Sequence, residues 1–357
     1  MSKDRERRPT LDTVAQRVGV SRATVSNAYN RPDQLSPALR ERIIATAKQL
    51  GYAGPDPVAR SLATQRTGSV AVMLCDGLSS AFSDPALSIT LDALSATVDS
   101  GERSLLLLPG TGGNGPGARS VIRAHTDVAI AYSLPDDAPA LDAVRERGLP
   151  LVVVDEPDVP DAAQVRVDDL GGALQAGRHV TSLGHRQLGI ISLAMSADGA
   201  HGPVSPQRIA AARFRVTLDR LSGYLKALAE HGIVADAVPI WEAPGSVREL
   251  GREGARWLLG REPRPTALLC MSDELALGAI RAANELGMSV PAEVSIVGFD
   301  DTPAASWGDL TTVRQDLVAK GRQAGELALR MLNGARPDKP VTIDVDLVVR
   351  GSTAAAM

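Results

Sequence analysis

The first fifty residues carry apolar positions at helical spacing in two short runs. Val14 and Val18 lie four residues apart, and Val25 and Ala28 lie three apart, on either side of Gly19. This spacing predicts two short helices, and a glycine between them suits a sharp turn because it tolerates a positive φ. The pattern therefore predicts a helix-turn-helix.

A third helix is predicted directly after it. Ser36 is a good N-cap, Pro37 suits the first helical position, and Gly51 marks the end. The apolar residues on one face of this helix are Leu39, Ile43, Ile44, Ala47 and Leu50. They close a three-helix core over residues 1–55.

A short segment, residues 56–68, follows this head. Pro55 and Pro57 favour a helix start, but the segment is too short to be a stable helix alone. We therefore expect it to fold only when docked on a partner.

From residue 69 onward, short apolar runs alternate with helical patterns. The first series predicts strands at 69–75, 104–108, 128–133, 151–155 and 164–167, with helices at 86–99 and 139–147. The second predicts strands at 188–193, 238–241, 267–271 and 295–299, with helices at 219–230, 247–259 and 274–286. A helix at 318–332 and a strand at 341–349 end the chain. Such alternation indicates α/β lobes with doubly wound parallel sheets.

We expect two lobes within an effector-binding core at 69–357. The expected division is residues 69–180 with 305–335, and 181–304 with 336–357. A ligand would bind in the cleft between the lobes, at the carboxyl ends of the strands.

Charge is distributed unevenly along the chain. Residues 1–66 contain 12 Lys/Arg and six Asp/Glu, whereas the whole chain has a net charge of −4. A basic head on an acidic body suits phosphate binding, because counterion release supplies much of the affinity for DNA.

Other features exclude several classes of protein. Cys75 and Cys270 lie in apolar runs, which predicts buried thiols in a reducing cytoplasm. A signal peptide and a membrane-spanning run are both missing, so we expect a cytoplasmic location and no membrane partner. The sequence also lacks catalytic motifs and metal-ligand spacing. We therefore expect no enzyme and no cofactor.

The chain resembles the LacI/GalR family of bacterial transcription repressors. The similarity begins with the helix-turn-helix and continues through Ala59-Arg60-Ser61-Leu62. Family signatures recur at Leu183-Gly184-His185-Arg186, Ser272 to Gly278 and Val297 to Thr302. The resemblance implies a periplasmic-binding-protein-like core and a hinge helix between head and core.

The second helix of the head is expected to read DNA. Arg22, Ala23 and Asn27 fall in its first two turns, the part that enters a major groove in this motif. The resemblance implies that Leu62 of each hinge helix opens the minor groove as an apolar wedge. The DNA-binding residues we predict are Thr10, Ser21, Arg22, Ala23, Thr24, Ser26, Asn27, Tyr29, Ala59, Arg60 and Leu62.

The resemblance also implies effector-binding residues in the core. Arg220, at the start of the predicted helix 219–230, and Asp300, at a strand end, match family ligand positions. Phe82 matches an aromatic in a family loop, although lid packing is the alternative. Asp273 either contacts the ligand or caps a helix, and Trp241 lies near a family aromatic position. Loop 197–206 is expected to border the cleft.

These features predict a homodimeric repressor. It would bind a pseudo-palindromic operator in double-stranded DNA and leave it when a small effector, by default a sugar, binds between the lobes. A dimer is favoured over a tetramer because no heptad tail follows the last strand. One alternative is a purine, nucleoside or other metabolite acting as corepressor. A remote alternative is the solute-binding protein of a transporter.

Overall fold

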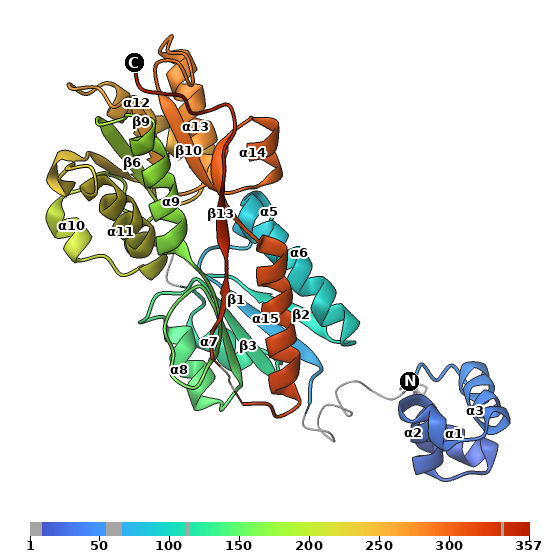
Figure 1. The fold of residues 1–357 in the computed structure, drawn as a ribbon. Coiled ribbons are helices and arrows are strands. Elements are labelled where there is room, and N and C mark those ends of the chain that lie inside the picture. Colours follow the sequence, from blue (N-terminus) through green and yellow to red (C-terminus); the bar gives the residue numbers. More distant parts are fainter. Residues whose placement is uncertain (1–8, 55–65, 111–114, 337–338) are drawn as a thin grey trace, which may run out of the picture. The chain divides into compact units, whose positions relative to one another are not determined.

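The computed structural model describes residues 9–54, 66–110, 115–336 and 339–357. It divides into two compact units, Met1–Thr67 and Gly68–Met357 (Figure 1). Within the described ranges, no helix combines the length and the apolar character needed to cross a bilayer.

The head is the three-helix unit that the sequence predicts. It contains α1 (Leu11–Val18), α2 (Arg22–Asn30), a 3-10 turn η1 (Pro32–Gln34) and α3 (Pro37–Gln49). Gly19 ends α1 with φ +77°, which is the left-handed turn expected there. The side chains of Thr10, Ser21 and Ser36 cap the three helices. The small core of the head comprises Val14, Ala15, Val25, Ala28, Ile43 and Ala47.

The first lobe of the core contains a six-stranded parallel sheet. Its strands lie in the order β12 (Val341–Ile343), β5 (Ala163–Val167), β4 (Leu151–Val154), β3 (Val128–Tyr132), β1 (Ser69–Leu74) and β2 (Ser104–Leu108). Helices α6 (Pro85–Ser100) and α15 (Leu317–Leu332) pack together over one face. Helices α7 (Ala118–Arg123) and α8 (Pro139–Glu146) pack together over the other, and the short α5 (Ser80–Ser83) precedes α6.

The second lobe contains a seven-stranded sheet. Its order is β13 (Val345–Val348), β11 (Thr311–Gln315), β10 (Ser295–Asp300), β9 (Ala267–Cys270), β6 (Leu188–Ser192), β8 (Ile240–Glu242) and β7 (Gly202–Pro203). Only the two edge strands run antiparallel to their neighbours. Helices α9 (Asp169–Ser182) and α11 (Arg215–Ala229) pair with each other, as do α12 (Arg248–Leu259) and α13 (Asp273–Glu285). Short helices α10 (Pro206–Ala210), α14 (Pro303–Trp307) and η2 (Ala235–Ala237) complete it.

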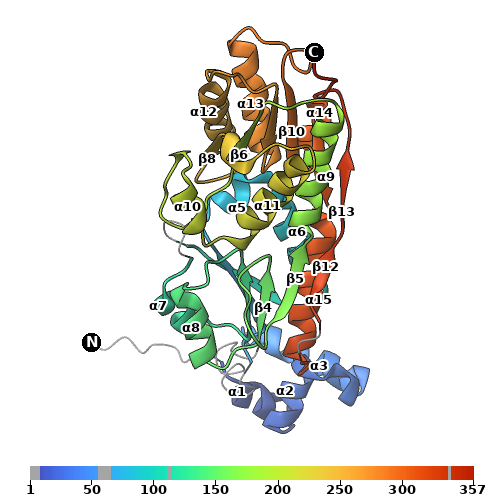
Figure 2. The ribbon, with the colours of Figure 1, turned by 60° about the vertical axis from the view of Figure 1, so that its left-hand side comes forward.

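The two doubly wound lobes confirm the predicted fold class, and most element bounds differ from the prediction by one or two residues. Figure 2 shows the two lobes of the core joined by several chain segments. The predicted strand at 341–349 is in fact two strands, β12 and β13, which belong to different sheets. One extended segment changes its pairing partner at Asp344, and the alternation of side chains does not reveal that change.

The division between the lobes also differs from the expectation. Residues 305–335 do not stay together, because β11 pairs with β10 in the second sheet while α15 packs on the first. Residues 169–180, expected in the first lobe, form most of helix α9, which packs against α11 of the second. Strand and helix patterns show what an element is, but sheet membership depends on pairing between distant segments.

Candidate functional sites

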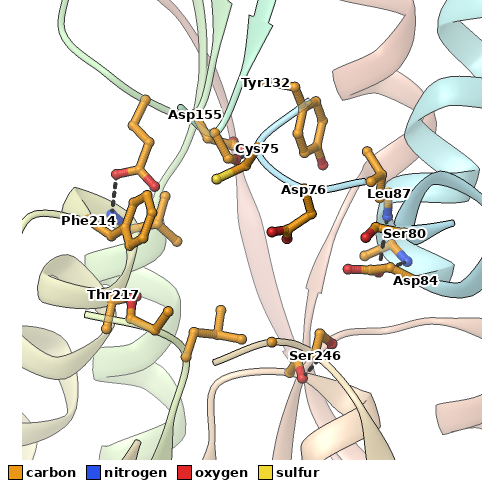
Figure 3. Close-up of a pocket in the computed structure, with 18 of the residues that line it drawn as sticks. Cys75, Asp76, Ser80, Asp84, Leu87, Tyr132, Asp155, Phe214, Thr217 and Ser246 are labelled. Carbon is orange, nitrogen blue, oxygen red and sulfur yellow. Dashed lines mark hydrogen bonds between the residues drawn. The ribbon is translucent and has the colours of Figure 1, made fainter. Parts of the chain in front are cut away.

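A cavity of about 410 Å³ lies between the two lobes. Residues that follow the carboxyl ends of strands in both sheets line it, as expected for a ligand site in a doubly wound fold (Figure 3). The first lobe contributes Asp76 after β1 and Asp155 after β4, and the second contributes Asp300 and Gln315 from the ends of β10 and β11.

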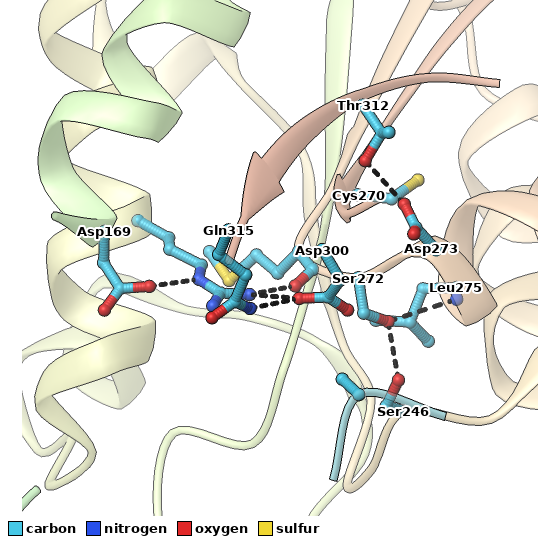
Figure 4. Close-up of polar contacts among 12 residues, drawn as sticks. Asp169, Ser246, Cys270, Ser272, Asp273, Leu275, Asp300, Thr312 and Gln315 are labelled. Atoms are coloured by element: carbon cyan, nitrogen blue, oxygen red, sulfur yellow. Dashed lines mark hydrogen bonds and ion pairs between the residues drawn. The ribbon is translucent and has the colours of Figure 1, made fainter. Parts of the chain in front are cut away.

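Arg220 is the central cation of the second-lobe wall. Its Nε donates to Asp169 Oδ1 at 2.8 Å, and its Nη1 donates to the carbonyl of Met271 (Figure 4). The guanidinium lies 3.6 Å from the ring centroid of Phe299, a favourable cation–π geometry. Arg220 is buried but lines the cavity, and its Nη2 makes no hydrogen bond within the described part of the chain. The two N–H groups of Nη2 therefore remain as donors for a ligand.

Asp300 stands beside this arginine. Its Oδ1 accepts a hydrogen bond of 2.6 Å from Gln315 Nε2 and lies 3.9 Å from Arg220 Nη1. Burial raises the pKa of this carboxyl well above its ordinary value, although the charge of Arg220 opposes the shift. Asp300 also holds a positive φ of +120°, a rare conformation for a residue with a side chain.

A second buried ion pair, Lys320 with Asp155 in the first lobe, reaches the second lobe through Gln315. Lys320 Nζ, from α15, donates to Asp155 Oδ2 at 3.1 Å and to Gln315 Oε1 at 3.1 Å. Asp155 belongs to the first lobe and Gln315 to the second. Nearby acidic groups, Asp155 above all, raise the pKa of Lys320 although burial opposes the shift. The lysine therefore stays charged and ties the two walls together.

Glu156 makes another contact between the lobes. Its Oε2 accepts hydrogen bonds from the backbone N–H groups of Arg215, at 2.5 Å, and Val216, at 3.3 Å. These groups open helix α11, where an acceptor satisfies donors that have no partner inside the helix. Burial nevertheless dominates and raises the pKa of Glu156 to about 8.

The first-lobe wall adds two more carboxylates. Asp76 points into the cavity (Figure 3), and Asp84 caps α6 by accepting from the backbone N–H groups of Ala86 and Leu87. Burial raises the pKa of both carboxyls. Among the described residues, five acidic side chains and two cations line the cavity. Both cations already contact acidic side chains, so little positive charge is left for an anionic ligand.

Two of the five predicted effector residues, Arg220 and Asp300, lie in the cavity. Helix α11 begins at Arg215 and not at residue 219, so Arg220 lies in its second turn and not at its start. The apolar pattern before residue 219 is too short to show that the helix begins earlier. Loop 197–206 borders the cavity through Ala197 and Gly199, as expected.

The other three do not line the cavity. Phe82 is 78% exposed and lies outside it. Asp273 is fully buried and accepts from Thr302 and Thr312, so it holds the segments after β10 and in β11. Trp241 is buried against Trp257, with ring centroids 5.4 Å apart. A residue's place near a strand end did not reveal which way its side chain points.

Several lining residues were missed by sequence reasoning. They are Asp76, Asp84, Tyr132, Asp155, Glu156, Ser272, Gln315 and Lys320. A polar residue at the end of a buried strand, or one or two residues beyond it, was the available signal for Asp76, Asp155, Ser272 and Gln315. For Lys320, inside a helix, the local sequence offers no such signal.

The head exposes four of the predicted DNA-binding residues, which are Thr10, Ser21, Arg22 and Ala23. Arg22 and Ala23 are exposed in the first turn of α2, and Arg22 lies 3.8 Å from Asp12. Asn27 donates to Gln34 Oε1 at 3.4 Å. The hydroxyl groups of Thr10 and Ser21 cap helices, so these two residues also have structural tasks.

The side chains of other predicted DNA-binding residues contact neighbours within the head, and three of these residues lie outside the described part of the chain. Thr24 contacts Ser21, and Ser26 accepts from Asn30. Tyr29 packs edge-on against Tyr52, with centroids 6.1 Å apart. Ala59, Arg60 and Leu62 lie outside the described residues.

Comparison with known proteins identifies the families of the head and of the core. Residues 10–54 match the model for bacterial regulatory proteins of the lacI family, and residues 178–353 match that for a periplasmic binding protein-like domain. The chain is 39% identical to the HTH-type transcriptional regulator Rv3575c of Mycobacterium tuberculosis, with 99% of both chains covered.

Two solved structures share the fold along nearly the whole chain. The lac repressor dimer bound to operator and the anti-inducer ONPF has a TM-score of 0.76 at 25% identity, covering 97% of this chain and 99% of that one. The complex of transcriptional regulator CelR with cellobiose has a TM-score of 0.67 at 28% identity, covering 97% and 100%. The chain thus belongs to the lacI family of bacterial regulatory proteins and is a helix-turn-helix transcriptional regulator.

Proposed function

We propose that this regulator is a homodimeric repressor that acts in the cytoplasm and is released from a pseudo-palindromic operator by a neutral, polyhydroxylated effector of the sugar class. The observation that carries the proposal is the cavity between the two lobes, lined by acidic and apolar side chains, in a chain that also has a helix-turn-helix head.

The lining of the cavity favours a ligand that is rich in hydrogen-bond donors. Five acidic side chains face it, while Arg220 and Lys320 already contact acidic partners. Hydroxyl groups can hydrogen-bond to an acidic side chain in either protonation state, whereas a phosphate would find both cations already paired and would lose its hydration. Leu87, Tyr132 and Phe214 add apolar surface for a sugar ring. The related CelR structure contains cellobiose.

An effector that touches both walls favours one arrangement of the lobes over others. Asp76 and Asp84 belong to the first lobe, and Arg220 and Asp300 to the second. A ligand shifts such an equilibrium only by its difference in affinity for the two arrangements. Because the coupling is reciprocal, operator DNA must weaken effector binding by the same factor as the effector weakens DNA binding.

An apolar surface on the core supports the dimer. Phe82 is 78% exposed and Trp307 is 86% exposed, and both line one hollow with Pro85, Ile89 and Pro303. Large exposed aromatic side chains of this kind mark interaction surfaces. We name this the Phe82–Trp307 surface. It combines α5 and α6 of the first lobe with α14 of the second, so lobe movement would alter it.

The test begins with operator sequences selected from random DNA by the full-length protein. A thermal-shift screen then compares neutral sugars with sugar phosphates, nucleosides and purines, since a ligand of the folded state raises the melting temperature. We expect a neutral sugar to stabilise the protein and to release the operator. Asp300→Ala should abolish the shift.

Other outcomes of this screen would contradict the proposal in distinct ways. Preference for a sugar phosphate over its parent sugar would refute the charge argument. A purine or nucleoside as the only hit would refute the sugar class. Tighter DNA binding in the presence of the hit would make the ligand a corepressor.

The reading of DNA by α2 has its own test. Arg22 is a candidate for bidentate contact with guanine, so Arg22→Ala should cost about 1–3 kcal/mol at one base position of the operator. Gel-shift affinities on a set of single-base operator variants measure this cost. An equal loss on every sequence would assign Arg22 to phosphate contact instead.

A further inference from the structure

The chain between β6 and α11 makes an excursion that forms part of the cavity wall. Its lining residues are Leu193, Ala194, Ser196, Ala197, Gly199 and Phe214. The base of the excursion is closed where the N–H groups of Arg213 and Phe214 donate to the carbonyl of Met195, at 2.6 and 3.1 Å. Farther along, the edge strand β7 pairs with β8.

One side chain holds the outer part of this excursion. Arg208, in α10, donates from Nη1 to Asp198 Oδ2 at 2.6 Å and from Nη2 to Asp198 Oδ1 at 2.8 Å. The same guanidinium donates from Nε and Nη2 to the two oxygens of Glu242, at 2.8 and 2.7 Å. Both contacts are bidentate, the strongest and most directional geometry for an arginine and a carboxylate.

The two carboxylates differ in their surroundings. Glu242 is 3% exposed at the end of β8 and also accepts from the backbone N–H of Met195 at 2.7 Å. Asp198 is exposed, as are the three residues that follow it. Burial of apolar side chains therefore does little to hold residues 198–201, and Arg208 connects them to a fixed point in the sheet.

We propose that Arg208 is a positioning residue for the effector, which fixes residues 196–199 as one wall of the cavity by joining Asp198 to Glu242. Arg208 does not line the cavity itself. It sets the size of the ligand that the cavity admits. The statement about ligand size rests on the proposed function, whereas the statement about the wall does not.

The protein contains a thiol that can report on this wall without a ligand. Cys75 lines the cavity and is partly exposed, whereas Cys270 is completely buried. Burial raises the pKa of Cys75 to about 12, and the thiolate is the form that reacts. The modification rates of all variants are therefore compared at one alkaline pH. The rates of modification by a small neutral reagent, methyl methanethiosulfonate, and by a bulky one, dithionitrobenzoate, measure access to the cavity.

Asp198→Ala and Arg208→Gln should each speed modification of Cys75 by the bulky reagent about tenfold relative to the small one, because the wall opens more often. Asp142→Ala is the matched control. It removes another exposed aspartate that pairs with an arginine, Arg145 at 2.8 Å, outside the cavity lining. It should leave the ratio unchanged.

The second readout is ligand size. Glucose and cellobiose serve as probes, and the ratio of their dissociation constants should shift toward the larger sugar in both wall variants. An unchanged thiol ratio in folded Asp198→Ala would overturn the proposal. In Asp198→Ala, Arg208 still pairs with the buried Glu242, so we expect this variant to fold. It therefore tests the proposal even if Arg208→Gln does not fold. If neither sugar binds the wild type but the thiol ratio rises, the wall is confirmed and the sugar proposal fails.

Discussion

Arg220 and Lys320 place two positive charges in a buried site, and each charge has defined partners. Arg220 has Asp169 at 2.8 Å and Asp300 at 3.9 Å, and Lys320 has Asp155 at 3.1 Å. Removing water from a charge is costly, so these groups are stable only as sets. The same sets leave individual oxygens and one arginine nitrogen directed at the cavity.

Replacing Arg220 should therefore destabilise the fold as well as abolish effector binding. In Arg220→Met the buried Asp169 and Asp300 lose their cation, and we expect a loss of about 3–5 kcal/mol in the free energy of unfolding. Urea denaturation measures it. The control Arg178→Met removes an arginine from an exposed pair with Glu230 and should change stability little. A loss below about 1 kcal/mol for Arg220→Met would show that the pair is not desolvated.

Glu156 should give stability a distinctive pH dependence. Its pKa is about 8 in the folded protein, above the value of about 4.3 for an unfolded chain. Between these values the folded state holds the extra proton, so stability falls as pH rises from about 5 to 8, by about 1.4 kcal/mol per pH unit for this one group.

Urea denaturation of the wild type and of Glu156→Gln across that pH range tests this dependence. The variant cannot titrate at this position, so its stability should decline less steeply with pH than that of the wild type. Parallel curves would show that Glu156 titrates normally.

At the scale of elements, glycines allow α12 and α13 to approach closely. A Cβ on Gly278 would lie 2.0 Å from the carbonyl oxygen of Arg248, and one on Gly251 would lie 2.1 Å from that of Leu275. Backbone atoms cannot move aside as a flexible side chain can. The two helices can therefore pack this closely only because Gly251 and Gly278 have no side chain.

Gly278→Ala should force these helices apart and cost about 1–3 kcal/mol, as overpacking of a core does. Thermal unfolding measures the loss. Gly117→Ala provides the control, since nothing lies within 4 Å of a Cβ there and its φ of −65° suits alanine. If both variants melt alike, the helix contact is more tolerant than its geometry indicates.

At the scale of the whole molecule, the Phe82–Trp307 surface bears on assembly. Trp307→Ala removes its most exposed aromatic side chain, and truncation of a buried interface tryptophan commonly costs more than about 2 kcal/mol of binding. We expect the dimer dissociation constant to rise at least about 30-fold, measured by sedimentation. Ile122→Ala, which removes an exposed apolar side chain on α7, should not weaken the dimer. An unaffected Trp307→Ala dimer would place the interface elsewhere.

The sequence alone determined many of the elements and their order. Helical spacing around Gly19, the caps at Ser21 and Ser36, and the alternation of strands with helices are local patterns. They record which face of each element is buried and where each element ends. The resemblance carried by motifs also identified Arg220 and Asp300, because both lie in family signatures or at family positions.

Only the tertiary structure decided which elements share a sheet and which side chains share the cavity. Lys320 and Asp155 meet across 165 positions of sequence, and β12 and β13 separate into two sheets within one extended run. Phe82 and Trp241 were expected at the ligand but point elsewhere. The physical reason is that side-chain direction and strand pairing depend on the packing of segments distant in sequence, which local periodicity does not encode.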